Sequence, residues 1–325
     1  MAGVQTSANV QADFELQLEQ HRRALTGYCY RMLGSSFEAE DAVQEAFLRA
    51  WRNVDRFEGR SAFKSWLYKI ATNVCLDLLD GRNRRARPME MGTEGTGEGP
   101  LGDVLPESVW LQPMPDGRVL TPEMDPAELA VQRESIRLAF MAALQHLPPR
   151  QRVVLILREV LRWKADEVAA LLGSSVASVN SALQRARATL AAVDAGTEDD
   201  FEPMDEAQKN LLARYVSAFT AYDITAMVAL LREDATASMP PFQLWLQGRD
   251  DIGRWHLGPG HTCRGSVLVP VQANGSPAFA HYRPGPNGHE PFSIQVLELT
   301  GDRISKITYF LDTDLFEKFG LPQHP

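Results

Sequence analysis

"ADEVAALLGSSVASVNSALQRARATL", residues 165–190, is the stretch of this 325-residue chain that decides its fold. Its first eight residues predict a short helix, and Gly173 ends that helix because glycine readily takes the left-handed conformation of a helix end. Either Ser174 or Ser175 can cap the next helix by accepting its free backbone N–H groups. The inner face of the first helix carries Val168, Leu171 and Leu172.

The second helix of this stretch has one apolar stripe, because its apolar residues recur at alternating spacings of three and four. Its other faces present small polar side chains at the front, which allow close approach to base edges, and arginines behind them, which suit phosphates. The pattern predicts a helix-turn-helix that reads the major groove of DNA, although an amphipathic hairpin with solvated arginines has the same periodicity. The stripe consists of Val176, Val179, Leu183, Ala186 and Leu190, and the polar faces carry Ala177, Ser178, Asn180, Ser181, Gln184, Arg185 and Arg187.

The net charge of −9 at pH 7 is unevenly distributed along the chain. Residues 134–192 carry eight Lys and Arg against four Asp and Glu, residues 88–133 carry two against nine, and residues 200–325 carry ten against fifteen. The basic excess therefore lies in the segment with the helix-turn-helix pattern, and the total charge does not exclude a nucleic-acid partner. A second basic group consists of Arg82, Arg84, Arg85 and Arg87.

The composition, with 44% hydrophobic and 23% charged residues, predicts an ordinary globular protein of two or three domains. The three cysteines form no CxxC pair, which argues against a zinc ribbon or a disulfide scaffold and fits a reducing cytoplasm. The N-terminus lacks the basic start and apolar run of a signal peptide, and no stretch approaches the roughly 20 apolar residues of a membrane span. We therefore expect a cytoplasmic protein without a metal or cofactor.

Periodicity and composition divide the chain into three modules, the first two all-α and the third α+β. The first module spans residues 12–87, of which 12–82 read as continuous helix with short breaks, and a second helical block covers residues 134–192. Residues 88–133 are rich in Gly, Pro and acids, and we expect a flexible linker there because such a segment buries too little apolar surface to fold alone. The third module, residues 206–320, begins with two helices and continues with short strand-like runs.

Two charged or aromatic helix faces in the first module are candidate partner surfaces. In "FEAEDAVQEAFLRAWRNVDRF", residues 37–57, an apolar face opposes a charged face that includes Leu48, and an apolar residue within a charged strip indicates a partner rather than solvent alone. In residues 57–87, helical spacing predicts a core stripe and leaves other aromatic and basic side chains nearer the surface. The predicted stripe is Phe63, Leu67, Ile70, Val74 and Leu78, and the surface set is Trp66, Tyr68, Lys69 and Asn73, with Trp66 undecided.

"YRMLGSSFEAEDAVQEAFLRAWRNVDRFEGRSAFKSWLYKIATNVCLDLL" resembles region 2, and "LPPRQRVVLILREVLRWKADEVAALLGSSVASVNSALQRARATL" resembles region 4, of the bacterial sigma-70-type factors of the extracytoplasmic-function (group 4) class. The resemblance covers residues 12–190, and the two blocks stand in the family's order with a linker between them. It implies a subunit that binds core RNA polymerase through the β′ clamp helices and the β flap and recognises promoter DNA. It also implies that the acidic linker threads through the polymerase toward the RNA exit path.

The resemblance assigns roles to matching positions of this sequence. Opening of the −10 element needs places for unstacked bases, which aromatic side chains supply at about 1–3 kcal/mol each. The surface for core polymerase is then Asp41, Gln44, Glu45, Leu48 and Arg52; the −10 set is Arg56, Phe57, Gly59, Arg60, Ser61, Lys64, Trp66, Tyr68, Lys69 and Asn73; the −35 set is Ser174, Ser175, Ala177, Ser178, Ser181, Gln184, Arg185 and Arg187.

The third module, from "LLARYVSAFTAYDITAMVALLREDATASMPPF" onward, resembles the SnoaL-like branch of the NTF2-like fold, a curved sheet wrapped against helices around a pocket. Relatives with isomerase chemistry need a carboxylate base, and the matching position here is Met239, which cannot abstract a proton. We therefore expect a regulatory or ligand-sensing module, and we expect Asp223 to cap a helix. The pocket candidates are Tyr215, Met239, Trp245, Trp255 and His281.

Two other functions remain compatible with parts of the sequence. A free-standing helix-turn-helix regulator explains residues 165–190 and would bind duplex DNA without polymerase. An NTF2-like isomerase or hydrolase with a DNA-binding front end would show turnover in the 206–325 fragment alone. An anti-sigma factor, or a small-molecule ligand of the third module, is a further expected partner.

Overall fold

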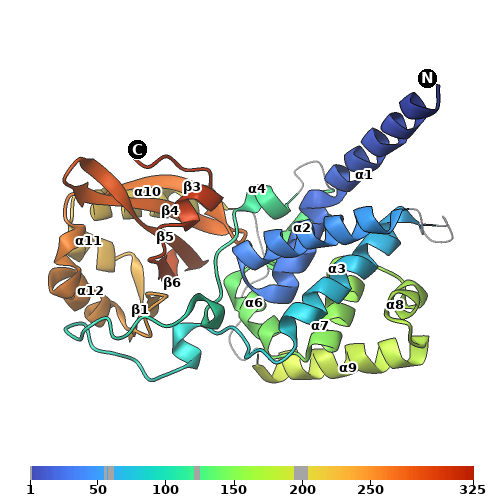
Figure 1. Ribbon diagram of the computed structural model, residues 1–325. Helices are drawn as coiled ribbons and strands as arrows, with labels where there is room; N and C mark the ends of the chain where they lie inside the picture. The colour runs from blue at the N-terminus through green and yellow to red at the C-terminus, as the bar shows by residue number, and fades with distance from the viewer. Residues whose placement is uncertain (1, 55–56, 58–61, 121–124, 194–203) are drawn as a thin grey trace. The chain divides into compact units, whose positions relative to one another are not determined.

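The computed structural model describes residues 2–54, 57, 62–120, 125–193 and 204–325, and for residues 2–12 it describes the backbone alone. The chain forms two compact units (Figure 1). The first unit comprises Met1–Asn83, Gly117–Ser135 and Ala143–Ala195, and the second comprises Arg84–Asp116, Ile136–Ala142 and Gly196–Pro325. The two helical modules thus share one unit, and each unit is described by itself.

The first unit is built of helices throughout its described length. Its N-terminal part consists of α1 (Ala2–Leu33), α2 (Ser36–Arg52) and α3 (Phe63–Leu79). Two helices of the middle segment follow, α4 (Asp116–Val119) and α5 (Pro126–Glu134). The C-terminal part contains the end of α6 (Leu138–Gln145), whose residues up to Ala142 are assigned to the second unit, and then α7 (Pro149–Leu155) with a π-helical turn over Ile156–Val160, α8 (Ala165–Leu172) and α9 (Val176–Val193).

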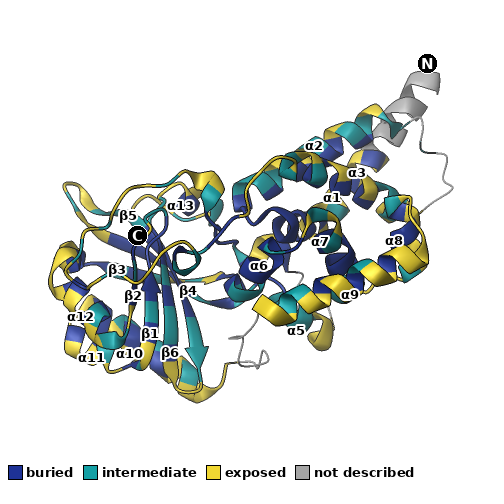
Figure 2. Ribbon diagram, turned by 90° about the horizontal axis from the view of Figure 1, so that it is seen from below, coloured by how far each residue is buried: buried dark blue, intermediate teal, exposed yellow. Residues whose placement is uncertain are grey.

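Helices α1, α2 and α3 pack around an apolar core, which Figure 2 shows as the buried inner faces of these helices. The Tyr28 hydroxyl on α1 is hydrogen-bonded to the Thr72 hydroxyl on α3 at 2.7 Å, inside that core. Helix α2 begins where the Ser35 hydroxyl accepts the Glu38 N–H, at 3.1 Å. The predicted core stripe of α3 needs correction, because the residues buried on this helix are Leu67, Tyr68, Ala71, Thr72, Val74 and Cys75, whereas Phe63, Ile70 and Leu78 are half-buried.

Within the first unit, two buried arginines hold the N-terminal helices to the C-terminal ones. Arg152 of α7 donates to the backbone carbonyl of Met32 in α1 and, at 2.9 Å, to the side-chain oxygen of Gln145. Arg31 of α1 donates to the hydroxyl of Ser135 at 2.9 Å and to the side-chain oxygen of Gln132 at 2.6 Å. The bonds to Met32, Ser135 and Gln132 join segments more than 100 residues apart in the sequence.

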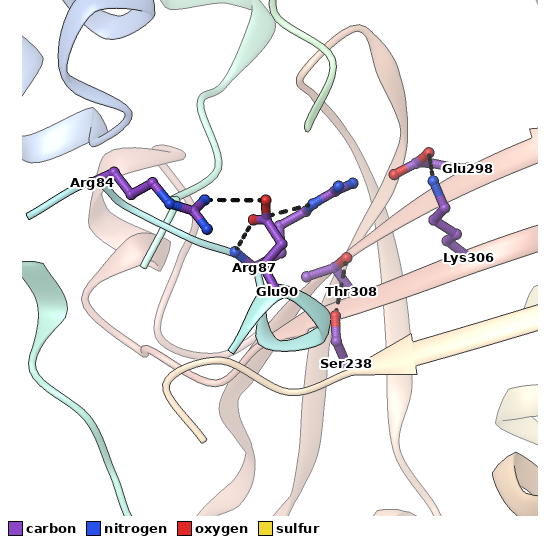
Figure 3. Close-up of polar contacts among 7 residues, drawn as sticks. All are labelled: Arg84, Arg87, Glu90, Ser238, Glu298, Lys306 and Thr308. Atoms are coloured by element: carbon purple, nitrogen blue, oxygen red, sulfur yellow. Dashed lines mark hydrogen bonds and ion pairs between the residues drawn. The ribbon is translucent and has the colours of Figure 1, made fainter. Parts of the chain in front are cut away.

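The second unit contains a six-stranded sheet in the order β2-β1-β6-β5-β4-β3. Strands β1 and β6 are parallel and the other neighbours are antiparallel. Cross-strand pairs mark the register, with Lys306 and Glu298 at 3.0 Å and the hydroxyls of Ser238 and Thr308 at 3.5 Å (Figure 3). The strands are β1 (Leu231–Ser238), β2 (Trp245–Gln247), β3 (Val267–Ala273), β4 (Ser276–Gly285), β5 (Gly288–Thr300) and β6 (Arg303–Phe310).

Helices α10 (Glu206–Thr220), α11 (Ile224–Val228) and α12 (Arg249–Leu257) pack with the sheet around the core of the second unit, and α13 (Leu315–Lys318) lies near the C-terminus. The prediction that Asp223 caps a helix is confirmed, because its carboxylate accepts the Ala226 N–H at 2.9 Å. The predicted α+β character of this module is likewise confirmed. No helix within the described residues is long and apolar enough to cross a membrane.

Residues 84–116 differ from the flexible linker that the composition predicts, because they belong to the second unit. Trp110, Leu111 and Met114 are each at most 3% exposed, and Leu101 packs against the core of the unit. The segment also forms two short 3-10 helices, Pro88–Glu90 and Glu107–Val109. A stretch too polar to fold alone has therefore folded onto the sheet domain.

Candidate nucleic-acid interface

Helices α8 and α9 form the predicted helix-turn-helix. Gly173 ends α8 with φ at +60°, and the Ser175 hydroxyl caps α9 by accepting the Ser178 N–H at 3.2 Å. At the start of α8 a side chain within the helix binds the backbone that precedes it, because the Glu167 carboxylate accepts the Lys164 N–H at 2.7 Å. Side chains close to the turn thus fix where each helix begins and ends.

One face of α9 is buried and the other is open to solvent (Figure 2). The buried stripe contains Val179, Leu183 and Ala186, whereas Val176, predicted to belong to it, is 42% exposed at the first turn. Arg187 is already engaged, since it forms an ion pair with Glu159 at 2.6 Å. Every residue of the predicted −35 set is exposed: Ser174, Ser175, Ala177, Ser178, Ser181, Gln184, Arg185 and Arg187.

The predicted −10 set divides into exposed, half-buried and buried residues. Lys64, Lys69 and Asn73 are exposed on α3. Trp66 is half-buried in an aromatic cluster, with ring centroids 4.9 Å from Phe57, 5.8 Å from Phe63 and 6.5 Å from Phe14. Arg56, Gly59, Arg60 and Ser61 lie outside the described residues.

Tyr68 is placed differently from the sequence prediction of a surface aromatic, because it is only 1% exposed. Its ring centroid lies 5.1 Å from that of Trp163 and 5.3 Å from that of Tyr28. Burial raises the pKa of the Tyr68 hydroxyl, so that the side chain is a neutral part of the core. Trp163 precedes α8, and the sequence could not show that this distant residue covers α3.

The predicted polymerase-binding face lies on the outer side of α2. Asp41, Gln44, Leu48 and Arg52 are exposed there, and Glu45 is half-exposed. Leu48 keeps 46% of its surface in contact with solvent, which is unusual for an apolar side chain amid charges. The opposite face is buried, as the periodicity predicted, through Ala39, Ala42, Val43, Ala46, Phe47 and Ala50.

Sequence reasoning missed the two buried arginines of the first unit. Burial lowers the pKa of both Arg31 and Arg152 to about 10. Their guanidinium groups are held by carbonyl, amide and hydroxyl oxygens of α1, of α5 and its C-terminal end, and of α6 and the residues that follow it. Sequence carried no signal for them, because an arginine on a helix is normally solvated.

The interior of the second unit gathers four of the five pocket candidates. Tyr215, Met239, Trp255 and His281 are each at most 7% exposed. Trp245 differs from the prediction, because its indole N–H donates to the Gly92 carbonyl at 3.0 Å and therefore contacts the linker segment. Alternation along the short strand β2 explains this, since the neighbouring Leu246 occupies the core side.

A chain of hydrogen bonds crosses this interior. The Tyr215 hydroxyl donates to the Gln295 side-chain oxygen at 2.8 Å, and the Gln295 amide nitrogen lies 3.1 Å from Nδ1 of His281. Nε2 of His256 lies 3.3 Å from the Tyr309 hydroxyl. Burial lowers the pKa of His256 to about 4 and that of His281 to about 3, with His256 and Arg283 adding to the latter shift. The imidazoles are therefore neutral at pH 7.

Comparisons with known proteins agree with this arrangement. The model of Sigma-70 region 2 matches residues 18–85, and that of Sigma-70, region 4 matches residues 137–190. The ECF RNA polymerase sigma factor SigG of Mycobacterium tuberculosis is 45% identical over 315 residues, which cover 95% of this chain and 84% of the relative. The chain belongs to the extracytoplasmic-function (ECF) RNA polymerase sigma factors.

A second relative extends the likeness to a solved structure. The ECF sigma factor SigJ of M. tuberculosis is 30% identical over 248 residues, 74% of this chain and 72% of the relative. The crystal structure of M. tuberculosis SigJ has a TM-score of 0.58 at 24% identity and covers 96% of this chain and 99% of that one. The fold, with two helical sigma regions followed by an α+β domain, is thus shared along nearly the whole chain.

Membership of this family fixes the biochemical role. The protein is a promoter-specificity subunit that binds core RNA polymerase and promoter DNA through sigma regions 2 and 4, and it is not an enzyme in its own right. Helix α8 and most of α9 lie within region 4, and α2 and α3 lie within region 2.

Proposed function

We propose that this sigma factor reads the −35 element with the exposed face of α9. The observation that supports this most strongly is the split of one helix into two faces. Val179, Leu183 and Ala186 fix its orientation from inside, while all eight predicted contact residues are exposed. Small side chains near the turn let the backbone approach base edges, and Arg185 further along reaches phosphates.

The −10 element, in the same proposal, meets region 2 along α3. Lys64, Lys69 and Asn73 are exposed on this helix and supply phosphate and base contacts. Trp66 packs with Phe57 and Phe63, and the half-exposed rings of this cluster offer stacking surfaces to unpaired bases. Core polymerase binds the outer face of α2, centred on Leu48.

We also infer the division of labour along the chain. Residues 12–87 and 134–192 read the promoter, and residues 206–320 control that activity without catalysis. Met239, which stands where relatives with isomerase chemistry carry a base, is 1% exposed within the core. The protein acts in the cytoplasm, where RNA polymerase works, and an anti-sigma factor or a ligand of the C-terminal domain remains a predicted partner.

The test is run-off transcription with purified core polymerase on a library of −35 sequences. Gln184→Ala should alter the preference at one base position, with a loss of about 1–3 kcal/mol in discrimination. Arg185→Ala should weaken binding to all sequences alike and reduce the slope of log affinity against log salt by about 1. Lys209→Ala, which removes an exposed charge from α10, is the matched control. An unchanged base preference for Gln184→Ala would refute the assignment of α9.

A further inference from the structure

The segment between the two sigma regions is held along the surface of the C-terminal domain by backbone hydrogen bonds. The Gly95 N–H donates to the Trp245 carbonyl at 2.8 Å, and the Trp245 indole returns a bond to the Gly92 carbonyl at 3.0 Å. Farther along, the Leu105 N–H donates to the Pro241 carbonyl at 3.0 Å. These partners belong to strand β2 and the turn that precedes it.

Glycines in this segment fit the close approach of two backbones. A Cβ atom at Gly97 would lie 2.4 Å from the Asp251 carbonyl oxygen and 2.7 Å from Cβ of Arg254, both on α12. The Gly97 N–H donates to the Asp251 carboxylate at 2.8 Å, and this bond is the main cause of the lowered pKa of that carboxyl group. A Cβ atom at Gly95 would lie 2.5 Å from the Leu244 side chain. The composition that resembled a flexible linker is therefore matched to this surface.

The arginines at the start of the segment form their hydrogen bonds and ion pairs with other residues of the same segment. Glu90 accepts the Arg87 backbone N–H at 2.7 Å and forms an ion pair with Arg84 at 3.3 Å (Figure 3). Arg85 is 4% exposed and donates to the carbonyls of Glu107 and Trp110 at 2.6 and 2.7 Å. The segment thus has a fixed conformation of its own, with a buried apolar end at residues 110–114.

Asn274 is hydrogen-bonded to this end of the segment. It occupies the tip of the β3–β4 hairpin with φ at +56°, followed by Gly275 at +65°, as a two-residue hairpin turn requires. Its side-chain oxygen accepts the Met114 N–H at 2.9 Å, and its amide nitrogen donates to the Ile136 carbonyl at 2.6 Å. Hairpin tips normally face water, yet Asn274 is 0% exposed.

The same hairpin tip fixes two points of the chain that flank the middle helices. Its backbone adds a bond from the Asn274 N–H to the Met114 carbonyl at 3.0 Å and one from the Gly275 N–H to the Asp116 carboxylate at 2.8 Å. Ile136 directly precedes the residues that match region 4. One turn therefore binds both Met114, at the end of the linker segment, and Ile136.

We propose that the C-terminal domain binds residues 91–116 as an intramolecular ligand, at a site formed by β2, α12 and the β3–β4 turn, and that core RNA polymerase must take this segment from that site. The proposal rests on the proposed function and on the path through the polymerase that the family resemblance implies for the linker. A segment seated on the sheet domain cannot at the same time extend through the polymerase. Only molecules in which the segment is released bind core enzyme. The apparent affinity is therefore the intrinsic affinity multiplied by the released fraction. Glu94, Glu98 and Asp103 stay exposed in the docked state.

Two variants undock the segment from opposite sides. Asn274→Asp keeps the size of the side chain but replaces the amide donor to Ile136 by a carboxylate oxygen. Gly97→Val adds side-chain atoms against α12 and leaves the sheet domain itself unchanged. Asn287→Asp is the matched control, because Asn287 also precedes a glycine in a hairpin turn but is exposed.

The measurements are hydrogen exchange of residues 91–116 in the free full-length chain and the affinity for purified core polymerase. Each undocking variant should speed exchange of the segment at least about tenfold and tighten core binding by a similar factor, with Asn287→Asp unchanged. Rapid exchange of the wild-type segment would overturn the docking. Faster exchange without tighter core binding would overturn the competition. Promoter-directed transcription by the wild-type holoenzyme is scored separately, so that its failure would refute the proposed function instead.

Discussion

The two buried histidines of the C-terminal domain make its stability depend on pH. Burial holds the pKa of His256 at about 4 and that of His281 at about 3 in the folded protein, against about 6.5 in the unfolded chain. Nδ1 of His256 and Nε2 of His281 have no hydrogen-bond partner among the described residues, so the second N–H of each protonated ring would have no acceptor there. The stabilising neutral state is fully present above pH 6.5 and is lost as pH falls toward the folded pKa values.

The magnitude follows from linkage. At pH 5 the unfolded chain has protonated both imidazoles and the folded domain has protonated neither, which costs about 2 kcal/mol for each relative to pH 8. We expect the free energy of unfolding of the C-terminal domain to fall by about 4 kcal/mol over this interval. Burial raises the pKa of Asp312 and acts in the opposite direction, since the folded carboxyl group then binds its proton first.

The assay is oxidation of methionine by peroxide as a function of urea concentration, because a thioether does not titrate in this pH range. Met239 is 1% exposed and reports on the second unit, while Met32 is 0% exposed and reports on the first. His281→Gln should remove about half of the pH dependence seen at Met239, and the exposed His324→Gln should leave it intact. An undiminished pH dependence in His281→Gln would refute this reasoning.

Two further predictions concern the first unit. Leu48→Lys should weaken core polymerase binding at least about tenfold without loss of fold, because Leu48 is the apolar centre of the α2 face, and Leu257→Lys at another exposed leucine should not; equal binding by the two variants would exclude that face. Trp163→Ala should lower the stability of the first unit by about 3–5 kcal/mol through the lost contact with Tyr68, read from oxidation of Met32. A loss below about 1 kcal/mol would show that region 4 does not support α3 through this ring.

Local patterns were sufficient for the helix-turn-helix and for the two faces of α2. The buried stripe of α9 and the caps at Ser175 and Asp223 follow from residues within a few positions of each other. Such features are visible in sequence because helical periodicity and capping are short-range effects. The order of region 2, region 4 and an α+β module could likewise be predicted from the sequence alone.

Only the tertiary structure decided which distant residues cover a given helix face or segment. Helical spacing assigned both Tyr68 and Trp66 to the surface set of α3, yet Trp163 from a distant segment covers Tyr68, while Trp66 is half-buried beside Phe57. The glycine-rich segment of residues 88–116 reads as flexible, and its contacts with Asp251 and Asn274 show why glycines and polar residues stand there. Periodicity states that a face is apolar, and composition states that a segment cannot fold alone. Neither identifies the partner, because the covering residues lie far away in the sequence.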